Sequence, residues 1–142
     1  MAETQDNNRV EFELVSPQKL LKSEPVEMVV VPGAEGDFGV LPGHSLLIAT
    51  VRPGVIDIHE GGQVKESIFV AGGFAEVSPE RCTVLAEEAI PVEDIDKAAA
   101  EQRLDDAKAA LAKAEEDPET GTTALGRELL AAEAMVAAVP QS

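Results

Sequence analysis

Few side chains in this sequence are of types that could perform chemistry. There are two histidines, His44 and His59, and one cysteine, Cys82, and their spacing is not that of metal ligands. Residues 37–39 read Asp-Phe-Gly, as in the magnesium-binding triplet of kinases, but no Gly-rich phosphate loop or catalytic-loop motif accompanies them. Phosphate-binding and nucleophile-elbow motifs are also missing. We therefore expect no catalytic residues, no metal site and no enzyme activity.

Adjacent carboxylates occur at positions 87–88, 105–106 and 115–116. Paired carboxylates can act as general acid and general base. These pairs lie in an alanine- and lysine-rich stretch or at the end of a β-branched run, so we interpret them as solvated surface charges.

The segment 31–44 contains four glycines and two prolines between two apolar runs. Glycine tolerates the positive φ angles of tight turns, and proline removes backbone donors, which predicts that the sheet does not continue through the segment. We expect a stiff, exposed loop. It presents three polar side chains, Glu35, Asp37 and His44. A plain strand connection with no further role is the alternative.

The elements that position this loop are short β-strands. Apolar, β-branched runs recur about every ten residues, at 10–15, 26–31, 45–51, 55–59, 64–70, 74–77 and 82–87. Gly/Pro turns separate them, which indicates an antiparallel sandwich or barrel. We predict a β domain over residues 1–90.

Alanine replaces the β-branched residues after position 91. Two helical stripes follow, at positions 100, 104, 107, 111 and 114 and at 125, 129, 132, 136 and 139. Asp96 is placed to cap the first helix, and Pro118 interrupts the pattern. We predict an α-helical antiparallel hairpin over residues 91–142, loosely held because alanine buries little apolar surface.

Composition excludes several classes of function. The chain has 142 residues, 27 acidic and 11 basic, and a net charge of −16, which argues against binding nucleic acid or anionic lipid. There is no tyrosine or tryptophan to stack bases. No run is long and apolar enough to span a membrane, and residues 1–8 do not resemble a signal peptide. One cysteine cannot form an internal disulfide, so we expect a reducing compartment.

Several spaced motifs point to a family. They are the segment from Pro32 to His44, then Arg-Pro-Gly at 52–54, Ala-Gly-Gly-Phe-Ala-Glu-Val at 71–77 and Thr-Val-Leu-Ala at 83–86. In this order, before a helical hairpin, they resemble the epsilon subunit of bacterial rotary ATP synthases. The resemblance implies an all-β sandwich of about ten strands followed by two helices. It also implies a non-catalytic rotor subunit, in the central stalk between the gamma subunit and the c-ring, coupling proton translocation to ATP synthesis.

The resemblance also implies sites and location. It implies c-ring contacts at Glu35, Asp37 and His44, and gamma contacts at Gly72, Gly73 and Phe74. The C-terminal hairpin of such subunits can reach the alpha and beta catalytic subunits and regulate ATP hydrolysis. The resemblance implies no cofactor and a peripheral position at the cytoplasmic face of the bacterial inner membrane.

Two departures from the family bear on regulation. Some relatives bind ATP through Ile-Asp-x-x-Arg-Ala, where this chain has Ala99 in place of the arginine, so we expect no nucleotide site. In inhibitory relatives the second helix is basic, whereas here Arg127 is outnumbered by Glu128 and Glu133. We predict weak inhibition by the hairpin.

Two other classes of function stay open on the sequence. A free-standing β-sandwich could bind another partner and use the hairpin as a dimerisation arm. An enzyme with an unrecognised site is the weakest hypothesis, because no nucleophile or convergent base is visible.

Overall fold

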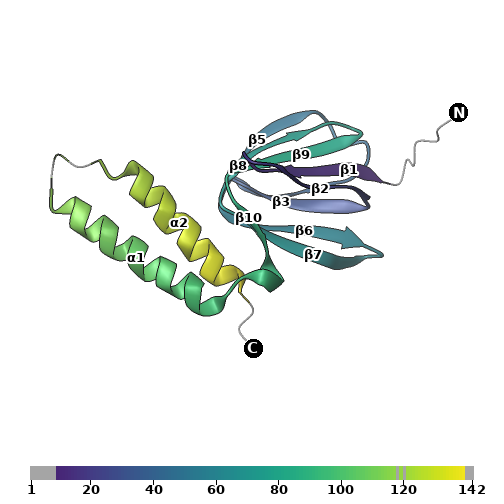
Figure 1. Ribbon diagram of the computed structural model, residues 1–142. Coiled ribbons are helices and arrows are strands. Elements are labelled where there is room, and N and C mark those ends of the chain that lie inside the picture. The colour runs from purple at the N-terminus through teal and green to yellow at the C-terminus, as the bar shows by residue number, and fades with distance from the viewer. Residues whose placement is uncertain (1–8, 118, 120, 140–142) are drawn as a thin grey trace, which may run out of the picture.

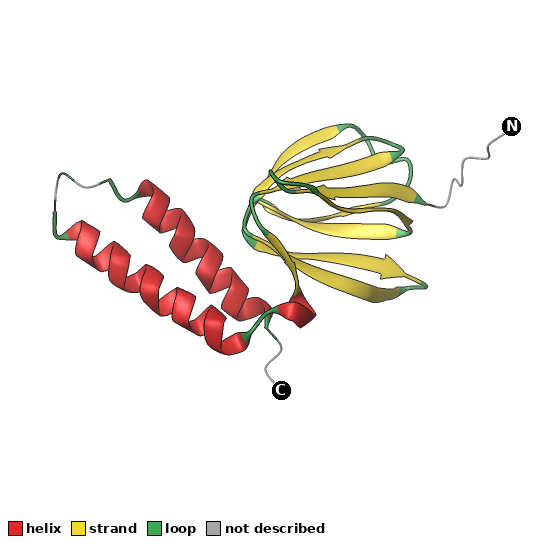
Figure 2. Ribbon diagram, in the orientation of Figure 1, coloured by secondary structure: helices red, strands yellow, loops and turns green. Residues whose placement is uncertain are grey.

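A computed structural model describes residues 9–117, 119 and 121–139. The chain forms a ten-stranded β-sheet followed by a short 3-10 helix and two α-helices (Figures 1 and 2). The strands are β1 (Val10–Val15), β2 (Leu20–Val26), β3 (Met28–Gly33), β4 (Gly36–Val40), β5 (Leu47–Val51), β6 (Gly54–Glu60), β7 (Gln63–Val70), β8 (Gly73–Val77), β9 (Arg81–Ala86) and β10 (Ala89–Pro91). The helices are η1 (Val92–Asp94), α1 (Lys97–Glu115) and α2 (Thr123–Ala138).

The sheet curls around one apolar core. Its strand order is β10-β7-β6-β3-β5-β8-β9-β1-β2, and β4 pairs with β3 beside this path. All pairs are antiparallel except β1 with β9, which is parallel, so the expectation of a purely antiparallel sheet was wrong at that pair. Lys22 of β2 lies 2.9 Å from Glu66 of β7, and this ion pair joins strands from opposite ends of the path.

Strand periodicity explains the core. In β1 every second side chain is buried, and Phe12 and Leu14 are among the largest fully buried residues. The remaining core residues come from nearly all strands and are mostly valine and isoleucine, which suit a pleated, buried surface.

Three strands, β2, β4 and β10, were not predicted from runs in the sequence. The run at 26–31 proved to hold the end of β2 and most of β3, with Glu27 between them. The predicted loop at 31–44 contains β4, which forms a hairpin with β3, so the sheet does continue through it. Pro32 fits inside β3 because its carbonyl oxygen accepts a 2.9 Å hydrogen bond from the amide of Arg52, and this bond needs no donor from proline.

The hairpin is held by small residues. The Asp96 side chain caps α1 by accepting hydrogen bonds from the amides of Ala98 and Ala99, at 2.9 and 3.2 Å, as predicted. The buried faces contain Ala100, Ala107 and Ala114 in α1 and Ala131, Ala132 and Met135 in α2. The predicted leucines of both stripes are only partly buried. The close approach of the two helices explains this, because alanine is the side chain that fits between them.

A second apolar cluster joins the hairpin to the sheet. Phe69 of β7 is fully buried and belongs to a cluster with Ala100, Met135 and Val139. Its neighbours Ile68 and Val70 belong to the main core, so Phe69 points to the opposite face of the strand. The predicted domain boundary at residues 90 and 91 falls within β10, directly before the short helix that leads into the hairpin.

Candidate functional site

The three polar residues of the predicted loop are spread along β4. Glu35 is exposed at the turn between β3 and β4, and Asp37 is exposed within β4. His44 follows the other end of the strand, where its Nδ1 lies 2.7 Å from the carbonyl oxygen of Ser45. The five-residue strand β4 separates Glu35 from Leu41 by about 20 Å of extended chain, so Glu35 and His44 do not meet. Glu35 precedes β4 and His44 follows it. Among the described strands, β4 pairs with β3 alone.

Arg52 fixes the tip of this hairpin. Its guanidinium donates to the carbonyl oxygen of Gly33 and to Oδ1 of Asp37, each at 2.6 Å. One cation therefore ties β3, β4 and the residue after β5 together. The sequence analysis used Arg52 only as part of a family motif, and its contact with Asp37 could not be read from their separation in the chain.

The outer face of the sheet carries three exposed apolar side chains over β5, β8 and β9. Ile48, Phe74 and Leu85 are 76%, 58% and 53% exposed. Phe74 lies opposite Thr50 on β5 and Leu85 on β9, which places these side chains on one face. Thr50 and Glu76 share this face, and a group of large exposed apolar side chains on one face of a domain is typical of an interaction surface. We call Ile48, Phe74 and Leu85 the outer patch.

The glycines before Phe74 shape this region. Gly73 has φ of +151°, and a Cβ on it would overlap the carbonyl group of Leu85. Gly72 has φ of +121° and is buried. Both glycines and Phe74 line a groove of about 510 Å³ that continues to Leu130 of α2. The close approach of β9 requires glycine at position 73, whereas the positive φ favours glycine at position 72.

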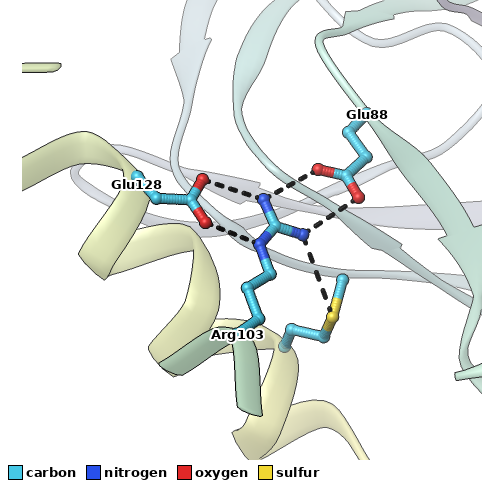
Figure 3. A network of polar contacts seen from close by, with 4 residues as sticks. Glu88, Arg103 and Glu128 are labelled. Atoms are coloured by element: carbon cyan, nitrogen blue, oxygen red, sulfur yellow. Dashed lines mark hydrogen bonds and ion pairs between the residues drawn. The ribbon is translucent and has the colours of Figure 1, made fainter. Parts of the chain in front are cut away.

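Figure 3 shows a network of charged side chains between the sheet and the hairpin. Arg103 of α1 donates from Nε and Nη2 to Glu128 of α2, at 2.7 and 3.0 Å. It donates from Nη1 and Nη2 to Glu88, at 3.0 Å each. Glu88 lies between β9 and β10, so one guanidinium joins three parts of the fold.

Arg103 changes the ionisation of Glu128. Its hydrogen bond holds the pKa of Glu128 below the ordinary value of 4.5, against partial burial, which acts in the other direction. The hydrogen bonds that Arg103 donates to Glu128 and Glu88 raise the pKa of Arg103. The interpretation of the 87–88 pair as solvated was therefore wrong for Glu88, although Glu87 is exposed. A lone arginine in an acidic, alanine-rich helix was the available signal.

No metal site or membrane helix is found in the described part of the chain. Residues 9–117, 119 and 121–139 hold no group of three or more potential metal ligands. Over the same residues no helix has the length and apolar character to cross a membrane. Cys82 is buried in the core, and burial raises its pKa to about 12, so its thiol is not poised to act as a nucleophile.

The fold is a curled sheet with exposed apolar side chains on its outer face and a helical hairpin packed against one side. These features are typical of a subunit that binds other proteins. Comparisons with known proteins specify which. A family model described as "ATP synthase, Delta/Epsilon chain, beta-sandwich domain" matches residues 9–92. The ATP synthase epsilon chain of Paramagnetospirillum magneticum is 61% identical over 131 residues, which cover 92% of this chain and 97% of that one.

Two further similarities agree. The ATP synthase epsilon chain of Rhodospirillum rubrum is 52% identical over 97% of this chain and 98% of its own length. A chain in the solved structure of Euglena gracilis mitochondrial ATP synthase, which contains OSCP, F1 and the c-ring, superposes with a TM-score of 0.77. The two are 26% identical, and the match covers 97% of this chain and 86% of that chain.

The chain belongs to the family of ATP synthase epsilon chains, which are non-catalytic central-stalk subunits. This confirms the resemblance seen in the sequence and the fold it implied. The chain works as a part of the membrane-associated ATP synthase, and its partners are other subunits of that complex.

Proposed function

We propose that this chain couples proton translocation to ATP synthesis by joining the gamma subunit to the c-ring, at the cytoplasmic face of a bacterial inner membrane. The observation that best supports this proposal is the outer patch, which exposes large apolar side chains on a closely packed sheet. Support comes from the similar chain in an assembly that contains F1 and the c-ring.

The outer patch is the surface we propose for gamma. Phe74 supplies the apolar contact, and Gly72 and Gly73 give a partner backbone access at the edge of the adjoining groove. Aromatic anchors surrounded by smaller apolar residues dominate many interfaces, because their burial removes the most surface from water. The large exposed area of Ile48, Phe74 and Leu85 fits this role.

The flank of β4 is the surface we propose for the c-ring. Its residues run from Glu35 through Asp37 to His44, along a strand that pairs with β3 alone among the described strands. Carboxylate and imidazole groups can bind basic and amide groups on a polar partner, and they fix orientation more than affinity. Arg52 donates a hydrogen bond to Asp37 and so orients this carboxylate on the flank.

The proposed hairpin role is weak contact with the alpha and beta catalytic subunits. Arg127 is accompanied by Glu128 and Glu133, and this balance does not favour an acidic partner. Deleting residues 91–142 should leave the ATP hydrolysis rate of the assembled synthase nearly unchanged. A strong increase on deletion would contradict weak inhibition.

The coupling role is tested with Phe74→Glu in the assembled synthase in membrane vesicles. A buried carboxylate at the gamma interface should weaken retention of the subunit and reduce ATP-driven proton pumping per ATP hydrolysed. Val64→Glu is the matched control, since Val64 is exposed on β7, away from the outer patch. Equal pumping by both variants would exclude the outer patch as the gamma contact.

The ring contact is tested separately. The double variant Glu35→Ala and Asp37→Ala should keep gamma in the purified complex but lower the coupling between pumping and hydrolysis. If the c-ring is retained and pumping is unaffected, the flank of β4 is not the ring contact.

A further inference from the structure

β5 has a backbone edge that the fold leaves open. β3 pairs with β5 only at Gly33 and Val51. The amide of Ala34 then donates a 2.9 Å hydrogen bond to the carbonyl oxygen of Thr50, and from there the chain turns away into β4. Backbone groups of alternate residues in a strand point to the same side, so the amide and carbonyl of Ile48 face the same way as those of Thr50. No described strand pairs with β5 on this side of Ile48.

A groove lies along this open edge. Its volume is about 360 Å³, and it is lined by the β3–β4 turn, Phe38 and residues 47–50 of β5. Phe38 is half-buried and Leu47 is 37% exposed, so apolar side chains form part of the lining. An added strand in the groove would lie where β3 would continue if the chain did not turn after Ala34.

Both ends of the strand order are protected, whereas this edge is not. Natural sheets block exposed edges with proline, short strands or charges that point inward. β2, at one end, contains Pro25 and carries Lys22 and Glu24 opposite buried core residues of β1. β10, at the other end, has three residues and ends at Pro91. β5 has none of these features, since its sequence is Leu-Ile-Ala-Thr-Val, and its edge is therefore suited to accept a strand.

Charge and position indicate what occupies the groove. Glu35 is exposed in the groove lining, and Glu76 is exposed on β8 opposite Ile48. The chain as a whole has a net charge of −16, so a segment with basic side chains is the complementary partner. Ile48 also belongs to the outer patch, which makes the groove continuous with the surface proposed for gamma.

We propose that gamma contributes an extended segment that pairs with the backbone of Ile48 and adds a short strand to β5. An apolar side chain of this segment fills the groove beside Phe38, and its basic side chains face Glu35 and Glu76. Backbone pairing supplies affinity, and the groove supplies specificity. The inference rests on the proposed function for the identity of the partner and adds the mode of binding.

Hydrogen exchange at single backbone amides tests the pairing in the full chain, free and in complex with gamma. The amide of Ile48 should exchange fast in the free chain and at least about tenfold more slowly in the complex, because it then donates to the added strand. The amide of Ala49 points to β8 in both states and should exchange slowly throughout. It therefore serves as an internal reference.

Ile48→Pro removes the donor, and Ile48→Ala is the matched control that shortens the side chain but keeps the donor. Proline is tolerated in a strand where its nitrogen faces an unpaired edge, so the two free variants should unfold at similar temperatures. Ile48→Pro should weaken binding to gamma about tenfold more than Ile48→Ala, because an acceptor of the added strand loses its partner. If Ile48→Pro does not fold, the exchange of the Ile48 amide in the parent chain decides.

Two results would overturn the added strand. An Ile48 amide that exchanges fast in the gamma complex would show that gamma binds without pairing to β5. Equal affinities of Ile48→Pro and Ile48→Ala would show the same, and both results would leave the outer patch as the gamma contact. Conversely, full binding of gamma by Phe74→Glu with a protected Ile48 amide would remove Phe74 from the interface and keep the added strand.

Discussion

Asp37 accepts a 2.6 Å hydrogen bond from Arg52, and this contact joins the middle of β4 to the residue that follows β5. The same guanidinium holds the carbonyl oxygen of Gly33. The β3–β4 hairpin is thus braced at its tip by the residue that follows β5. A segment rich in glycine acquires a defined shape through this brace.

Removing the brace should change shape more than stability. The two side chains are largely solvated, and exposed ion pairs contribute about 1 kcal/mol or less. We expect Asp37→Asn and Arg52→Gln each to lower the free energy of unfolding by no more than that amount. A double-mutant cycle by urea denaturation measures the coupling, and a coupling energy well above this range would show that the pair is structural.

Gly73→Ala should destabilise the fold severely. A Cβ at this position would overlap the backbone of Leu85, and φ is +151°. Gly36→Ala is the control, because φ there is +135° but no atom lies within 4 Å of the added Cβ. Thermal unfolding should show a much larger loss for Gly73→Ala. Similar losses would mean that backbone conformation alone, and not the close approach of β8 and β9, requires glycine.

The packing of α1 against α2 should weaken in acid. The pKa of Glu128 is lowered in the folded protein, so its pairing with Arg103 stabilises the fold at pH values above the ordinary 4.5. That contribution is lost as pH falls below 4.5 and through the lowered pKa, because the carboxylate becomes protonated. Denaturation at a series of pH values should give a shallower loss below pH 4.5 for Glu128→Gln. Parallel curves for the two proteins would contradict the assignment.

Two phenylalanines test the division between core and interface. Phe12→Ala removes a fully buried ring and should cost about 3–5 kcal/mol of unfolding free energy. Phe74→Ala makes the same change at a ring that is 58% exposed, and should cost less than about 1 kcal/mol while weakening binding to gamma. Calorimetry of the free subunit and affinity capture with gamma measure the two effects. A large stability loss at Phe74 would make it a structural residue.

Local patterns in the sequence predicted most of the elements. Runs of β-branched residues located seven of the ten strands, and the spacing of alanine and leucine located both helices with the Asp96 cap. The strands β2, β4 and β10 were missed because their sequences contain proline, glycine or charge. Pairing makes them strands: β2 and β4 pair with their chain neighbours β1 and β3, and β10 pairs with β7.

Some of the candidate functional residues could be named from the sequence, and others could not. Glu35, Asp37, His44 and Phe74 were named from motifs in the sequence, and their roles stay proposals. Arg103 and Arg52 were not singled out, because each acts through partners that are 15 to 25 positions away in the chain. Such pairs have no periodic signature.

By itself, the sequence determined the class of fold, the family and the absence of recognisable catalytic motifs, since these follow from local composition, spacing and motif order. Tertiary structure alone decided which charged residues act together, which apolar side chains stay exposed and how the hairpin is held. The physical reason is that ion pairing and burial depend on distances in space, which the folding of distant segments sets.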